Sequence, residues 1–141
     1  MFIYVFSIVL VVVSNVMYNV SQKSTPQNVN PFSALFITYL IAALFTITAA
    51  QFYKTNKGFV QSLYDLNWTT LVLGLSIVGL EVGYLLAYRA GWDISIGSLV
   101  ANISLALILI PIGVFFYQET FELHKIIGIV LCIIGLIFIN K

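Results

Sequence analysis

Three side chains suited to binding protons or cations recur along one strongly apolar stretch of the sequence. Glu81, Tyr84 and Tyr88 follow one another at spacings of three and four, so a helix places them on one face. A carboxylate can hold a proton or a cation, and tyrosine rings attract organic and quaternary cations through their π faces. The spacing therefore predicts a site for protons and cations, formed by Glu81, Tyr84 and Tyr88.

Glu81 stands out because it is ten residues into the apolar run 71–89, near the centre of a bilayer if that run spans one. A charge at this depth costs roughly 2.5 to 3.5 kcal/mol, so the side chain must face protein or water. Burial favours the neutral form of a carboxyl group, and proton and substrate could then compete for Glu81. The alternative is a structural ion pair or a hydrogen bond to Tyr or Asn on a neighbouring helix. Arg89 is about 12 Å further along the axis, which is too far for direct pairing.

The other side of the same helix carries small residues. Gly79 and Gly83 belong to a stripe of Ser, Gly and Ala at spacings of three and four. Small residues at this spacing let two membrane helices approach closely. We therefore expect Gly79 and Gly83 to pack against another helix.

The composition is that of an integral membrane protein. Of the 141 residues, 61% are hydrophobic and 8% charged, with a mean hydropathy of +1.06, whereas soluble domains carry about 25% charged residues. The apolar runs predict an all-α fold of five transmembrane helices in one domain, 1–141, at about 2–20, 32–53, 68–89, 94–117 and 123–140. The net charge of +1 provides no basic surface for nucleic acid. With one Cys and one His, no metal-site spacing, cofactor or nucleophilic triad is indicated, and we expect no enzyme.

Other polar residues could line a cavity between these helices. Ser14, Asn15 and Tyr18 form a mildly polar side of the first helix, and Asn102 lies in the fourth. In lipid, such groups either line a cavity or bond to neighbouring helices. The polar segment 21–31 is expected to be a loop, with Pro31 in the first turn of the second helix. Pro111 predicts a kink or freed carbonyls in the fourth.

The C-terminal third resembles the EamA-type module of the drug/metabolite transporter superfamily. That module ends with an apolar helix, a Gly/Gln-Glu turn and a Gly-containing helix that closes on Asn. The counterparts here are Gln118, Glu119, Gly128, Gly135 and Asn140, and the segment GYLLAYRAG at 83–91 is similar to the end of the module's third helix. Two features depart from the family's pattern: the fourth helix lacks an early proline, and Glu81 is unusual. The resemblance implies a five-helix transport module.

The resemblance also implies a partner, because such modules usually occur as inverted pairs with the site at the midplane between them. A single module is then expected to form a homodimer, or a heterodimer with a related module. Counting basic residues, one side of the membrane would hold Lys54, Lys57 and Lys125, and the other Lys23, Arg89 and Lys141. The orientation of a membrane protein follows the difference in the number of Lys and Arg residues between the two sides. A difference of zero favours dual topology and an antiparallel homodimer.

These observations predict a small secondary transporter or half-transporter, with alternating access at a midplane cavity and proton coupling through Glu81. Its expected substrate is a hydrophobic or organic cation, and its expected location is the bacterial cytoplasmic (inner) membrane. One alternative is a non-transporting membrane subunit that scaffolds or regulates a partner complex. Another is a subunit of a lipid-linked sugar flippase, whose substrate would be a lipid.

Overall fold

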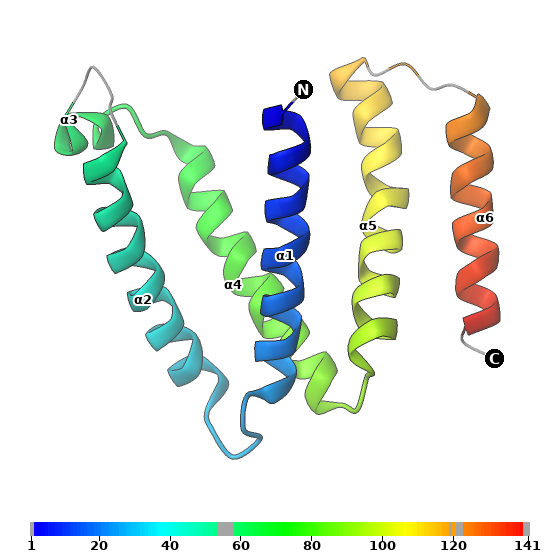
Figure 1. Ribbon diagram of the computed structural model, residues 1–141, viewed down its shortest axis with the longest axis horizontal. Coiled ribbons are helices and arrows are strands. Elements are labelled where there is room, and N and C mark those ends of the chain that lie inside the picture. Colours follow the sequence, from blue (N-terminus) through cyan, green and yellow to red (C-terminus); the bar gives the residue numbers. More distant parts are fainter. Residues whose placement is uncertain (1, 54–57, 119, 121–122, 140–141) are drawn as a thin grey trace. The chain divides into compact units, whose positions relative to one another are not determined.

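The computed structural model describes residues 2–53, 58–118, 120 and 123–139. All regular structure in these residues is helical (Figure 1). The helices, in chain order, are α1 (Phe2–Ser24), α2 (Pro31–Phe52), α3 (Phe59–Leu63), α4 (Trp68–Arg89), α5 (Ile94–Tyr117) and α6 (Leu123–Ile139).

Four of these helices, α1, α2, α4 and α5, are long and apolar enough to cross a membrane. Each has 22 to 24 residues, or about 33 to 36 Å at 1.5 Å per residue, against a hydrocarbon core of about 30 Å. Helix α6 is equally apolar but has 17 residues, about 26 Å. The predicted all-α membrane fold is confirmed, and α6 occupies the position of the expected fifth membrane helix.

The helix ends agree with the sequence prediction except at the first loop. Helix α1 continues to Ser24 rather than ending at residue 20, so the connection to α2 shortens to 25–30. Pro31 is in the first turn of α2, as predicted, and the side chain of Asn30 caps that helix by accepting a hydrogen bond from the Phe32 amide at 2.9 Å. Between α2 and α4, residues 59–63 form the short helix α3.

The chain divides into two compact units, Met1–Ala90 and Gly91–Lys141. In the second unit, α5 runs through Pro111 without interruption and ends at Gln118, which takes a left-handed conformation with φ 54°. Several residues discussed from the sequence lie outside the described part: Lys54, Lys57, Glu119, Asn140 and Lys141.

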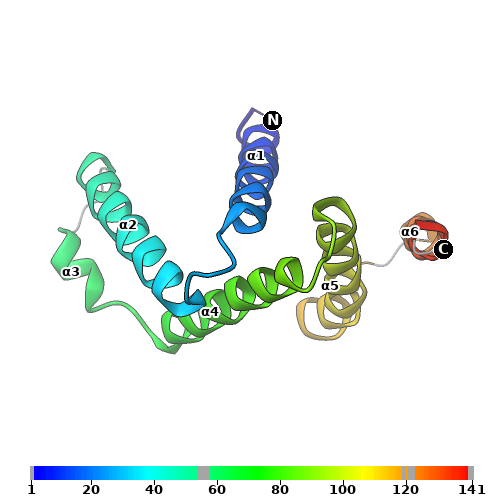
Figure 2. The ribbon, with the colours of Figure 1, turned by 90° about the horizontal axis from the view of Figure 1, so that it is seen from below.

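In the first unit, α4 packs against both α1 and α2 (Figures 1 and 2). Most side chains of this unit are exposed, as expected where lipid supplies the apolar surroundings. The buried residues gather where the three helices meet. They are Asn19 and Gln22 of α1, Leu35 of α2, and Leu85 and Tyr88 of α4. The second half of α1 is therefore held to α4 through buried polar side chains.

The end of α4 is fastened to the loop between α1 and α2. One terminal guanidinium nitrogen of Arg89, Nη2, donates hydrogen bonds to the backbone carbonyls of Pro26 at 3.1 Å and Val29 at 2.7 Å. The end of α1, the start of α2 and the end of α4 therefore lie together at one end of the unit (Figure 1).

Candidate functional site

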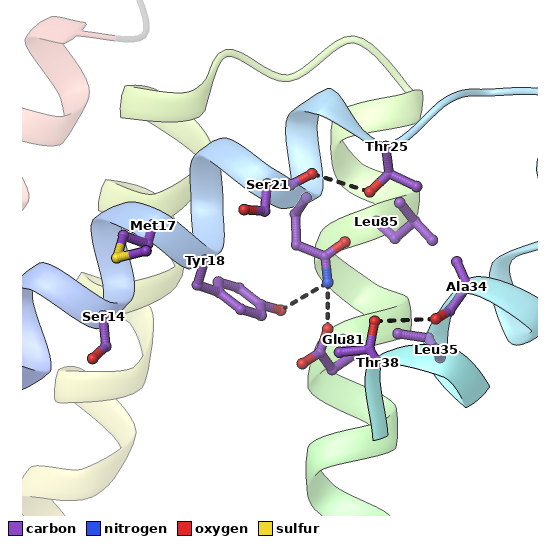
Figure 3. Close-up of a pocket in the computed structure, with 11 residues that line it drawn as sticks. Ser14, Met17, Tyr18, Ser21, Thr25, Ala34, Leu35, Thr38, Glu81 and Leu85 are labelled. Atoms are coloured by element: carbon purple, nitrogen blue, oxygen red, sulfur yellow. Dashed lines mark hydrogen bonds between the residues drawn. The ribbon is translucent and has the colours of Figure 1, made fainter. Parts of the chain in front are cut away.

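A cavity of about 300 Å³ lies between α1, α2 and α4 of the first unit (Figure 3). This volume is at the lower end of the range of about 300 to 1,000 Å³ that holds small-molecule ligands. Its lining is mixed, with apolar side chains, hydroxyl groups, one amide and one carboxylate. The lining residues are Ser14, Met17, Tyr18, Ser21 and Gln22 from α1; Thr25, which follows α1; Ala34, Leu35 and Thr38 from α2; and Glu81 and Leu85 from α4.

Glu81 is the single charged residue among those that line the cavity in the described part of the chain. Its carboxylate accepts a hydrogen bond from the side-chain amide of Gln22. The same amide nitrogen lies 3.4 Å from the hydroxyl oxygen of Tyr18 and donates to it. Gln22 is only 8% exposed, so this hydrogen-bond partner of Glu81 is a buried neutral amide.

Gln22 is one of the site residues that the sequence analysis missed, because the segment 21–31 was expected to be a loop. The extension of α1 to Ser24 turns Gln22 into a helical residue that faces α4. A signal for it was present: Asn15, Tyr18 and Gln22 follow at spacings of three and four, so the polar stripe of α1 continues past its expected end.

A second polar network joins α1 and α4 beside the cavity. The Tyr88 hydroxyl donates to the side-chain oxygen of Asn19. The Asn19 amide donates in turn to the side-chain oxygen of Asn15 and to its backbone carbonyl, the latter at 2.8 Å. Tyr88 and Asn19 are 4% and 5% exposed. Asn15 and Tyr88 thus serve the contact between the helices, and neither lines the cavity.

The rings of Tyr84 and Tyr88, which share a predicted helix face with Glu81, form a row with the ring of Tyr18 rather than an aromatic cage. The ring of Tyr84 meets that of Tyr18 edge to face, at 5.5 Å and 81°, and lies 5.9 Å from that of Tyr88. The ammonium of Lys23 is 5.7 Å from the centre of the Tyr88 ring, within the range of a cation–π contact. Of these three tyrosines, only Tyr18 lines the cavity.

The residues predicted to line a cavity lie in both structural units of the chain. Ser14 and Tyr18, two of the predicted cavity residues, are among the residues that line this cavity. Asn102 belongs to α5 in the second unit, where its amide donates to the Ser98 carbonyl at 2.8 Å.

The packing predicted for the glycine face of α4 is not made within the described first unit. A Cβ added to Gly79 or Gly83 would meet nothing within 4 Å. The physical reason is that α4 turns the face of Glu81, Leu85 and Tyr88 toward α1 and α2. The glycines point about 200° away from that face.

Comparison with models of known protein families gives a match for the chain. The model of the EamA-like transporter family matches residues 2–141. The protein belongs to the EamA-like transporter family. The resemblance inferred from the sequence is confirmed, and the match runs through both structural units. No curated protein and no solved structure matches the chain.

Membership of the EamA-like family establishes an integral membrane protein of the drug/metabolite transporter type. A further tyrosine of the first unit, Tyr39, lies on α2. The hydroxyl oxygen of Tyr39 is buried and has no hydrogen-bond partner among the described residues.

Proposed function

We propose that this EamA-like protein is a small secondary transporter, or one half of a transporter, that exchanges protons for organic cations by alternating access. The observation that carries the proposal is the carboxylate of Glu81 in a cavity of about 300 Å³ with no basic residue among its described lining residues. Such a cavity favours a cation over an anion. A subunit that only scaffolds a partner complex needs no cavity of this kind.

Exchange follows from competition for one carboxylate. With the cavity empty, a proton neutralises Glu81 and avoids a bare charge in a low-dielectric site. A bound cation neutralises it instead, so the proton leaves. The amide of Gln22 suits both states, because it donates to the ionised carboxylate and, turned over, its oxygen accepts from the protonated acid.

A second module would complete the pathway. We propose that the chain pairs with a second copy in antiparallel orientation, or with a related module, in the bacterial inner membrane. The support is that a single module forms half of the usual inverted pair. The equal division of the six basic residues between the two predicted sides also fits insertion in both orientations.

The test is proton release from purified protein in weakly buffered detergent on addition of organic ammonium ions. Wild type is expected to release about one proton per cation bound, since one carboxylate exchanges the two, and Glu81→Gln is expected to release none. Asp93→Asn is the matched control, because Asp93 precedes α5 and its side chain makes no capping hydrogen bond. It should behave as wild type. No release from wild type with a panel of cations would refute the exchange.

A further inference from the structure

Two hydroxyl groups in the cavity donate their protons to backbone carbonyls. The Thr25 hydroxyl donates to the carbonyl of Ser21, and the Thr38 hydroxyl to the carbonyl of Ala34, each at 3.0 Å (Figure 3). A threonine hydroxyl has one proton and two lone pairs. With the proton used, each oxygen offers the cavity only hydrogen-bond acceptors.

The carboxylate of Glu81 adds acceptors from a third direction, since an ionised carboxylate has no proton to donate. The donors of the Gln22 amide nitrogen are already directed to Glu81 and Tyr18. Acceptors therefore reach the cavity from α2, from α4 and from the end of α1. A ligand that satisfies them needs a positive charge and several N–H groups.

Aromatic faces, in contrast, are sparse in the cavity. A quaternary ammonium ion has no N–H group and is recognised mainly by surrounding rings. Tyr84 and Tyr88 are not among the lining residues, and the face of Tyr88 carries the ammonium of Lys23. Tyr18 alone cannot form a cage.

We propose that the cavity selects protonated primary and secondary amines over quaternary ammonium ions. This inference rests on the proposed function and narrows its substrate class. One N–H of the ammonium group bonds to Glu81, and an N–H that remains bonds to a threonine oxygen of the cavity. A quaternary ion has no N–H group and makes neither hydrogen bond, and the loss of these bonds lowers its affinity.

The experiment measures calorimetric affinity and proton release for one series, butylammonium and its N-methyl, N,N-dimethyl and N,N,N-trimethyl derivatives. Wild type is expected to bind the primary ion at least about tenfold more tightly than the quaternary ion, the loss expected for about two hydrogen bonds. Equal or tighter binding of the quaternary ion, with proton release intact, overturns amine selectivity and leaves the proposed function standing. Absence of binding and release for every member refutes the proposed function and this inference with it.

The hydroxyl groups are tested by replacing them with a methyl group of the same shape. Thr38→Val is expected to weaken primary-amine binding severalfold, to leave quaternary binding unchanged, and to be rescued by Thr38→Ser. The matched control is Thr48→Val, because Thr48 makes the same hydrogen bond to its own helix, to Leu44 at 2.8 Å, but does not line the cavity. Should Thr38→Val fail to fold, Thr25→Val makes the same test. Unchanged selectivity in a folded variant overturns the assignment.

Discussion

The side-chain amide of Gln22, near the end of α1, donates a hydrogen bond to the carboxylate of Glu81 on α4. The two residues are 59 positions apart in the sequence and both line the cavity. In a protein whose helices are mostly apolar, this pair supplies both a contact between helices and a hydrogen-bond partner for the one acid in the cavity.

Replacing Gln22 by Leu is expected to lower the thermal stability of the purified protein. The change removes the donor and leaves the half-buried carboxylate of Glu81 without this hydrogen bond, at a cost of about 1 to 3 kcal/mol. Thermal unfolding in detergent measures the loss. Gln51→Leu is the control, because Gln51 lies exposed on α2. Equal melting temperatures for Gln22→Leu and wild type would contradict a structural role for this hydrogen bond.

The Tyr88→Phe substitution is expected to reduce stability by about 1 kcal/mol or more while leaving cation binding in place. The hydroxyl of Tyr88 bonds to buried Asn19 and does not line the cavity, so its loss affects the contact between α1 and α4. Thermal unfolding and calorimetric binding distinguish the two effects. Tyr64→Phe, at an exposed position, serves as the reference. A stable variant that no longer binds cations would place Tyr88 in the binding site instead.

Arg89→Lys is expected to release the loop between α1 and α2. The guanidinium of Arg89 bonds through one nitrogen to two carbonyls of that loop, whereas a lysine ammonium is a more strongly hydrated group on a flexible stem and holds the loop less firmly. Hydrogen bonds to charged groups contribute about 1.5 to 3 kcal/mol each. Amide hydrogen exchange at residues 25–30 should therefore accelerate more than at the centres of α1 and α2. Unchanged exchange in this loop would show that Arg89 does not fasten it.

Cation affinity is expected to fall as the pH is lowered. If each bound cation releases one proton from Glu81, the apparent affinity drops by up to about tenfold per pH unit once Glu81 is protonated in the empty protein. Above that range the carboxylate is already ionised, no proton is released, and the affinity becomes independent of pH. Calorimetric titrations across the pH range test this. The residual binding of Glu81→Gln should show no such slope, and an identical slope would assign the proton to another group.

Much of the fold follows from the sequence because run length and hydropathy decide which segments can enter a bilayer. The all-α membrane class, the helices around 68–89 and 94–117, and the family resemblance all depend on local composition and short motifs. Glu81 was recognised for a related reason. A single acid in the middle of an apolar run is costly in lipid wherever its helix packs. Neither inference requires knowledge of which helices meet.

Tertiary structure alone decided which faces came together. Every helix here is apolar on most sides, so hydropathy does not show which face of α1 meets α4. That contact made Gln22, expected in a loop, the partner of Glu81. It also buried Tyr88 against Asn19 and left Gly79 and Gly83 without a close neighbour in their unit. The sequence by itself determined the membrane fold and its acid, because both depend on local transfer energy. The partners of that acid depend on packing between distant segments, which only the three-dimensional arrangement specifies.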